Sequence, residues 1–247
     1  MPQKKKRLDQ LLVEKGLSPS RTRGRALIMT GKVRVNNQVI EKPGTLVSPS
    51  DDIFLKEDDM PYVSRGGLKL EEALRAFEIN VTGCVCLDAG ASTGGFSDCL
   101  LQHGAALVYA VDVGYGQLAW KLRQDSRVVV IERTNVRHLS PETIPHPIDI
   151  ITIDVSFISL KIVIPAVAKF MHPDSLLIAL IKPQFEVGRG QVGKGGVVRD
   201  PDLHHQVNKA VSDFAAEIGL TPEPIIASPL LGPKGNKEFI ILCKNKR

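Results

Sequence analysis

The stretch Cys84-Val-Cys-Leu-Asp-Ala-Gly-Ala-Ser-Thr-Gly-Gly-Phe96 decides the fold. Its apolar run, which ends at Asp88, predicts a buried strand, and the glycines that follow predict a tight turn opening into a helix. Glycine lets the backbone turn sharply and approach a ligand closely. The stretch therefore predicts one strand–loop–helix unit of an α/β fold, with a ligand-binding loop at the end of the strand.

Further apolar runs of strand length follow this loop and alternate with segments of helical periodicity. A βα alternation of this kind predicts a doubly wound, mainly parallel Rossmann-like sheet with helices on both faces. The predicted strands are 84–88, 108–112, 128–131, 148–154, 176–181, 225–227 and 239–243, and a helix over 69–77 precedes them.

The charge of the chain is concentrated at its N-terminal end. The 247 residues, 43% of them hydrophobic, suffice for one small and one medium domain, and the net charge is +5. Residues 1–47 carry eleven Lys and Arg against three acids, whereas the other 200 carry 21 basic against 24 acidic residues. This end is therefore predicted to bind a polyanion. Nucleic acid is preferred to a membrane surface because no long amphipathic helix carries the charge.

The apolar runs and the cysteines indicate where in the cell the protein is expected. No run reaches the roughly 20 apolar residues that span a bilayer, and no apolar signal core follows the basic start. The cysteines lack zinc-site spacing and are expected to be free thiols in a reducing compartment. We expect a soluble cytoplasmic protein with no metal site, membrane partner or obligate protein partner. These cysteines are Cys84, Cys86, Cys99 and Cys243.

Residues 1–60 predict a small α+β domain. Ser20 is a suitable cap for its second helix, and Asn36-Asn37 form a turn between alternating valines. The residues at 61–66 include Pro, Ser and Gly and predict a linker, which leaves 67–247 for the larger domain. The predicted elements are helices over 7–15 and 21–30 and strands around residues 33–35, 39 and 53–55.

Three motifs of this domain, Arg7-Leu-Asp-Gln-Leu-Leu12, Ser20-Arg-Thr-Arg23 and Ile28-Met-Thr-Gly-Lys-Val-Arg-Val-Asn36, resemble the αL RNA-binding module. That module occurs in a small-subunit ribosomal protein, in pseudouridine synthases and in tyrosyl-tRNA synthetases. The resemblance implies that folded RNA is bound through phosphates and shape. Alternate arginines on a helix do not share one face, so some could be ordinary surface. The predicted RNA-binding residues are Arg7, Arg21, Arg23, Lys32, Arg34 and Arg65.

The glycine loop and the acid about 20 residues beyond it fit a dinucleotide or S-adenosylmethionine, so a dehydrogenase stays an alternative. The spacing G-x-x-x-G-G departs from the G-x-G-x-x-G of pyrophosphate sites and resembles methyltransferase motif I. In that motif Asp88 would hold the methionine amino group and Asp112 the ribose hydroxyls. Asn135 is either near the adenine or a strand-end cap. The predicted S-adenosylmethionine site is Asp88, Gly90, Gly94, Gly95, Asp112 and Asn135.

The ends of two later strands indicate the atom that is methylated. Asp154-Val-Ser-Phe-Ile-Ser159 follows the fourth strand. Enzymes that methylate base amines usually carry Asn/Asp-Pro-Pro-Tyr/Phe here, and those that methylate carbon 5 of pyrimidines need a nucleophilic cysteine. This segment has neither. The fifth strand ends at Ile181-Lys182-Pro183, which places Lys182 at the carboxyl edge of the sheet, close to the site.

Lys69, Asp154, Lys182 and Glu238 fall where ribose 2′-O-methyltransferases of the FtsJ kind carry a Lys-Asp-Lys-Glu tetrad. Six stretches in order are similar to the haemolysin A (TlyA) family, whose members are implied to methylate cytidine 2′-hydroxyls in ribosomal RNA. Longer members with an extended C-terminal tail are implied to modify the RNA of both subunits. Because this chain ends soon after its last predicted strand, the resemblance favours large-subunit RNA. The stretches begin at Tyr62, Asp88, Asp112, Asp154, Lys182 and Gly195.

The residue types of the tetrad suit this chemistry. A ribose hydroxyl is a poor nucleophile, so the protein must align the reacting atoms and assist removal of the proton. A lysine acts as a base only when part of it is neutral, which burial and a second cation favour and carboxylates oppose. On this hypothesis Lys182 binds and deprotonates the hydroxyl, Lys69 and Asp154 orient Lys182, and Glu238 fixes the ribose.

Two other classes of function stay open at this stage. The chain could be a non-catalytic RNA-binding factor in ribosome assembly whose methyltransferase domain has lost its activity. The family name also suggests a membrane-active haemolysin, although the sequence shows no insertion segment.

Overall fold

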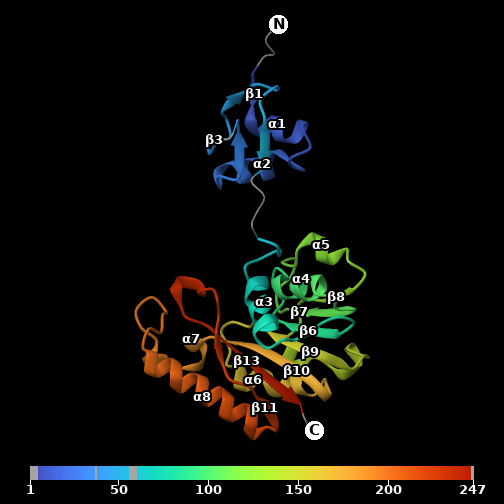
Figure 1. The fold of residues 1–247 in the computed structure, drawn as a ribbon, viewed down its shortest axis with the longest axis vertical. Helices are drawn as coiled ribbons and strands as arrows, with labels where there is room; N and C mark the ends of the chain where they lie inside the picture. Colours follow the sequence, from blue (N-terminus) through green and yellow to red (C-terminus); the bar gives the residue numbers. More distant parts are fainter. Residues whose placement is uncertain (1–4, 37, 56–59, 246–247) are drawn as a thin grey trace. The chain divides into compact units, whose positions relative to one another are not determined.

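The computed structural model describes residues 5–36, 38–55 and 60–245. The chain divides into two compact units, residues 1–61 and 62–247 (Figure 1). Each unit has a hydrophobic core of its own.

The first unit packs two short helices against small antiparallel strands. Helix α1 (Leu8–Glu14) contributes Leu8 and Leu12 to a core that includes Ile28 of α2 (Arg21–Met29). As predicted, Ser20 caps α2, since its hydroxyl accepts a hydrogen bond from the Arg23 amide at 3.2 Å. The strands are β1 (Lys6–Arg7) with β4 (Leu46–Val47), and β2 (Val33–Val35) between β3 (Gln38–Val39) and β5 (Ile53–Leu55). Half of the predicted turn, Asn37, lies outside the described residues.

The second unit contains a large sheet. In the described residues its strand order is β11-β13-β10-β9-β6-β7-β8, with β12 beside β13. Neighbours from β10 to β8 are parallel, and β13 is antiparallel to those it pairs with. The strands are β6 (Val85–Ala89), β7 (Leu107–Val111), β8 (Val128–Ile131), β9 (Ile148–Ile153), β10 (Met171–Ile181), β11 (Leu220–Pro222), β12 (Ile226–Ala227) and β13 (Phe239–Asn245).

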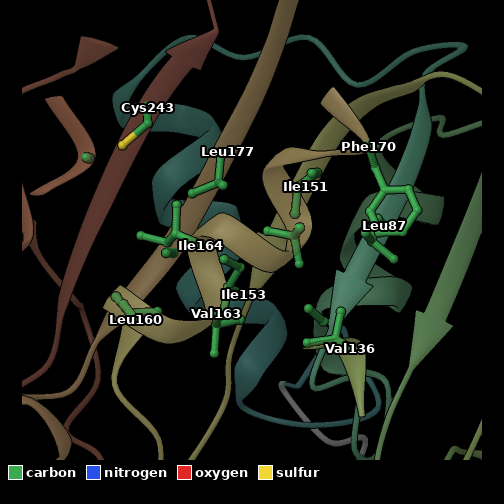
Figure 2. Close-up of a cluster of buried hydrophobic side chains, with 14 of the residues drawn as sticks. Leu87, Val136, Ile151, Ile153, Leu160, Val163, Ile164, Phe170, Leu177 and Cys243 are labelled. Carbon is green, nitrogen blue, oxygen red and sulfur yellow. The ribbon is translucent and has the colours of Figure 1, made fainter. Parts of the chain in front are cut away.

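Helices cover both faces of this sheet. On one face α3 (Gly66–Ala76), α4 (Gly95–Gln102) and α5 (Trp120–Arg123) contribute to one buried cluster. On the other, α6 (Leu160–Ala168) and α8 (Pro201–Glu217) pack on β9, β10 and β13. Figure 2 shows Leu160 and Ile164 of α6 in this cluster with Leu177 and Cys243. The predicted doubly wound sheet with a small N-terminal α+β domain is confirmed.

The segment before α3 differs from the predicted linker. Helix α3 begins at Gly66, and Tyr62 is only 6% exposed within the second unit. A Cβ atom on Gly67 would lie 2.2 Å from Tyr62 Cγ. The glycines at positions 66 and 67 therefore permit close packing at the start of α3 and do not break the helix. Residues 62–66 therefore belong to the second unit.

The order of the strands places a crevice at one edge of the sheet. The chain runs outward from β6 through β7 to β8, then crosses back to β9 on the other side of β6. Ligands of open α/β sheets bind outside the carboxyl ends of the strands at such a reversal. The ends of β6, β9 and β10 therefore mark the place to look for a site.

Candidate active site

A cavity of about 610 Å³ opens at this edge, and the four tetrad residues line it. Gly90 and Asp154 are neighbours because Ala89 of β6 pairs with Ile153 of β9. Ile181 of β10 pairs with Phe239 of β13, so the residues just beyond this pair, Lys182 and Glu238, come to the same edge. Parallel and antiparallel pairing thus bring distant parts of the chain to one cavity.

The four side chains form two lysine–carboxylate pairs. Lys69 Nζ lies 2.5 Å from Glu238 Oε2, and Lys182 Nζ lies 2.6 Å from Asp154 Oδ1. The second contact is close but is not aligned as a hydrogen bond; Lys182 instead donates to Ser156 Oγ at 3.2 Å. Lys182 is 8% exposed and Glu238 is 2% exposed. Both charges are therefore largely withdrawn from water and depend on their partners.

Some side chains join the segment after Lys182 to the segment after Asp154. Sequence reasoning missed these contacts. Glu186, at the end of α7 (Pro183–Glu186), accepts from Ser159 Oγ at 2.6 Å and from the Leu160 amide at 2.8 Å. The rings of Phe157 and Phe185 lie 4.9 Å apart, and Phe157 is 90% exposed with a φ of 64°. No short-range pattern signals such contacts, because they join segments more than 25 residues apart.

The glycine loop adopts the predicted shape. Gly90 has a φ of 87°, and a Cβ atom there would lie 2.7 Å from the Asp154 carbonyl oxygen. A Cβ atom on Gly94 would lie 2.2 Å from Leu122 Cδ1, and one on Gly95 would lie 2.2 Å from Ser64 Oγ. Gly90 and Gly95 line the cavity, whereas Gly94 packs under α5. The glycines thus allow close packing on both sides of the loop.

Asp88 lies beneath the glycine loop. Its side chain is fully buried beneath the loop, where it accepts from the Ser97 amide and hydroxyl at 3.0 and 2.7 Å and from Thr152 Oγ1 at 3.0 Å. Burial raises the pKa of Asp88 to about 6, and the hydrogen bonds from Ser97 and Thr152 oppose this rise. Asp88 does not line the cavity, and its hydrogen bonds to Ser97 tie the strand end to α4.

Asp112 and Asn135 lie beyond β7 and β8. Asp112 accepts from the amide of Ser92 in the glycine loop at 2.8 Å and from the Gly114 amide at 2.6 Å. Asn135 caps a short 3₁₀ turn, where its Oδ1 accepts from the Arg137 amide at 3.0 Å. The structure thus gives Asn135 the capping role, and neither residue lines the cavity.

The predicted RNA-binding residues occupy different settings. In the first unit Arg7 and Arg21 both bind the fully buried Asp9: Arg7 through Nε and Nη2 at 3.0 Å, and Arg21 through Nε at 3.1 Å. Arg23 is exposed, while Lys32 and Arg34 are half-buried. Arg65 is at the start of α3 in the second unit and lines the cavity.

The cavity and its glycine loop define a class of protein. An FtsJ-like methyltransferase model matches residues 62–246, and an S4 domain model matches residues 6–53. The chain is therefore an S-adenosylmethionine-dependent methyltransferase with an RNA-binding domain before its catalytic domain. Within the described residues, no helix has the length and apolarity needed to cross a membrane.

The relatives narrow this class to one family. The chain is 50% identical to the 16S/23S rRNA (cytidine-2′-O)-methyltransferase TlyA of Mycobacterium tuberculosis, over 97% of this chain and 90% of that protein. It is 42% identical to Hemolysin A of Brachyspira hyodysenteriae, over 95% and 98% of the two chains. A solved structure from Streptococcus thermophilus that carries the hemolysin name gives a TM-score of 0.76 at 42% identity, covering 98% and 89%. The chain belongs to the haemolysin A (TlyA) family.

Proposed function

We propose that the protein transfers a methyl group from S-adenosylmethionine to the ribose 2′-hydroxyl of a cytidine in ribosomal RNA. The observation that carries the proposal is the cavity in which the Lys69–Glu238 and Lys182–Asp154 pairs meet beside the glycine loop. The relative named for this activity shares half of its residues with the chain.

The cavity suits a hydroxyl better than a base atom. Its described lining has no cysteine that could attack a pyrimidine ring, and Asp154 is followed by Val155 and Ser156 in place of the prolines of amine methyltransferases. Lysines and carboxylates remain, which can hold a hydroxyl and take up its proton.

The residues around the glycine loop fit S-adenosylmethionine. The Gly90 backbone approaches Asp154 so closely that a side chain would fill the space, and Asp112, half-buried beside the loop, keeps acceptor capacity for ribose hydroxyls. We assign cofactor binding to Gly90, Gly95 and Asp112. Asp88 and Gly94 support the loop from beneath. The bound cofactor supplies a methyl group that is already activated as a sulfonium.

The chain's own residues must position the hydroxyl and remove its proton. A lysine accepts a proton only as the neutral amine, so we assign the proton acceptor to the amine form of Lys182, whose Nζ is held by Asp154 and Ser156 at the end of β10. Lys69 is fixed by Glu238, whose other oxygen, Oε1, is buried and has no hydrogen-bond partner in the described structure. We assign to Glu238 the role of fixing the ribose. Alignment of the reacting groups in the cavity is the main contribution expected of the protein.

The first unit would deliver the RNA. We propose that residues 1–60 bind RNA phosphates through Arg7, Arg21, Arg23, Lys32 and Arg34, and that the second unit, which begins at Tyr62, is catalytic. Since ribosomal RNA is the proposed substrate, the cytoplasm is the proposed location.

Labelled S-adenosylmethionine tests the proposal. The protein is incubated with large subunits, small subunits and naked ribosomal RNA from cells that lack the gene, and label is mapped by nuclease digestion and mass spectrometry. We expect label on a cytidine 2′-oxygen, and the subunit that carries it identifies the substrate. A folded, cofactor-binding protein that labels none of them would support the assembly-factor alternative.

A further inference from the structure

The charged side chains that line the cavity leave two cations in excess. The tetrad is balanced, because each of its lysines is paired with a carboxylate. The other charged residues of the described lining are Arg65 and Lys234, and neither has an ion pair or a side-chain hydrogen bond with a described residue. Bound S-adenosylmethionine, with a sulfonium and an ammonium against one carboxylate, would add further positive charge. The cavity therefore favours a second ligand that is anionic.

The two cations lie on different sides of the catalytic strand ends. Arg65 directly follows Ser64, whose Oγ would lie 2.2 Å from a Cβ atom on Gly95, so Arg65 stands beside the glycine loop. That loop follows β6, whereas Lys234 lies in the turn before β13. Strands β9 and β10 lie between β6 and β13 in the sheet. Lys234 is therefore the cation on the side away from the cofactor loop.

The backbone of Lys234 adopts a conformation that a lysine rarely takes. Lys234 and Gly235 have φ values of 59° and 85°, and the Asn236 amide donates to the Pro233 carbonyl at 3.3 Å, as in a turn of type I′. Such turns favour asparagine, aspartate or glycine at both central positions, because other side chains are strained at a positive φ. A strained residue at the rim of a site is a sign of function.

Hydrogen bonds fix this turn against a neighbouring loop. Asn236, only 3% exposed, donates to the carbonyls of Gly196 and Pro233 at 3.0 and 3.2 Å and accepts from the Val198 amide at 3.1 Å. A Cβ atom on Gly196 would lie 3.8 Å from Lys234 Nζ, so the ammonium group lies beside the same loop. Lys234 itself is exposed. A cation on a fixed turn loses less freedom when it binds an anion.

We propose that Lys234 binds a backbone phosphate of the RNA, beside the nucleotide whose hydroxyl Lys182 receives. A lysine binds phosphate as a point charge, and phosphate contacts set the position of a nucleic acid on a protein. The contact adds affinity and holds the strand at the cavity without reading a base. This inference rests on the proposed function and names a group of the RNA that the second unit binds.

Lys234→Asn tests the inference, because it removes the ammonium group and suits the turn. Affinity of the full chain for ribosomal subunits and naked ribosomal RNA is measured by filter binding over a salt series. Affinity should fall about 5- to 10-fold at about 0.1 M salt, and the slope of log affinity against log salt should shrink by about 1, as expected for the loss of one phosphate contact. The thermal midpoint should not fall, because asparagine tolerates a positive φ.

Two further variants separate the phosphate contact from general effects of charge. Lys234→Arg keeps the positive charge and should keep the salt slope of the parent. Lys209→Gln, at an exposed lysine of α8, should change the slope little. On the subunit that is labelled, Lys234→Asn should raise KM by a larger factor than it lowers kcat, because the contact is made before the chemical step.

The outcomes distinguish the two proposals. No 2′-O label from the parent protein overturns the proposed function, and the salt series still decides whether Lys234 contacts a phosphate. A salt slope in Lys234→Asn equal to that of the parent overturns the phosphate contact alone. Calorimetric titration of the cofactor is the last check: weaker binding of S-adenosylmethionine at an unchanged salt slope would place Lys234 on the cofactor's carboxylate and likewise overturn the inference.

Discussion

Lys69 in α3 and Glu238, immediately before the last strand, form an ion pair with 2.5 Å between Nζ and Oε2, although 169 positions separate them in the sequence. The side chains are 11% and 0% exposed. A pair this deeply buried is costly to break, because the remaining charge stays uncompensated.

Removal of one partner should therefore destabilise the catalytic unit. Lys69→Met should lower the free energy of unfolding by about 3 kcal/mol, whereas Lys69→Met combined with Glu238→Leu should recover most of that loss. Urea unfolding measures both values. Methyl transfer should be abolished in both variants, because both lack Lys69. Equal stability of the single and double variants would show that the pair is not coupled.

Loss of Lys182 should affect the chemical step. In Lys182→Ala the rate of methyl transfer should fall by about 10²–10⁴-fold, the usual contribution of a positioned acid or base, while cofactor affinity is kept. Single-turnover labelling and calorimetric titration measure the two quantities. Lys209→Ala, an exposed lysine of α8, is the matched control. A variant that folds, binds cofactor and methylates at the parent rate would remove Lys182 from the mechanism.

Gly232 should not tolerate a side chain. A Cβ atom there would lie 2.0 Å from Glu238 Oε1, so Gly232→Ala must displace that carboxylate. We expect a loss of activity of at least about 10-fold, because misplaced catalytic groups are costly. Gly190→Ala, at a position where a Cβ atom has nothing within 4 Å, should retain activity. Similar activity in the two variants would contradict the position assigned to Glu238.

Asp88 should make stability depend on pH. Its pKa is raised to about 6, so between pH 4 and 6 the folded state holds a proton that the unfolded state has released. Stability should then fall as pH rises through this window, by roughly 3 kcal/mol at about 1.4 kcal/mol per unit. Asp88→Asn should remove that part of the slope, as urea unfolding at several pH values would show. A variant with the parent's slope would assign the titration to another group.

Asp9 should orient the arginines of the S4 domain. Asp9→Asn removes one negative charge, so simple electrostatics predicts tighter RNA binding. We expect affinity for folded RNA to fall about 5-fold, because Arg7 and Arg21 lose the carboxylate that fixes their guanidinium groups. Filter binding across a salt series measures this. Glu14→Gln, which removes the partner of Lys6 in an exposed pair, should change affinity little. Tighter binding by Asp9→Asn would show that the arginines need no such orientation.

The sequence predicted the second unit well because most of its strands are long apolar runs between glycine or polar breaks. Prediction failed where that contrast is weak. Strand β11 has three residues and ends in Pro222, and β10 begins at Met171 with a polar segment that shifts register before Leu176. In the first unit, β1 and β4 have two residues each, too few for any periodicity.

The sequence predicted that the four tetrad residues lie together, but not which lysine pairs with which carboxylate. Strand ends and family motifs identified Lys182 and Asp154, but the partners of each lysine depend on register between strands far apart in the sequence. Asp88 shows the opposite case: the motif suggested contact with a ligand, whereas its neighbours Ser97 and Thr152 engage both of its oxygens. Sequence spacing does not reveal which way a side chain at a strand end turns.

The place of β13 in the sheet also makes the catalytic centre depend on an intact last strand. This strand lies between β10 and β11, and Glu238 stands immediately before it. A chain cut before residue 238 lacks the partner of Lys69 and leaves an edge of β10 unpaired. Proteolysis at this point should therefore destroy the catalytic centre and expose a strand edge through which the cut chains can aggregate.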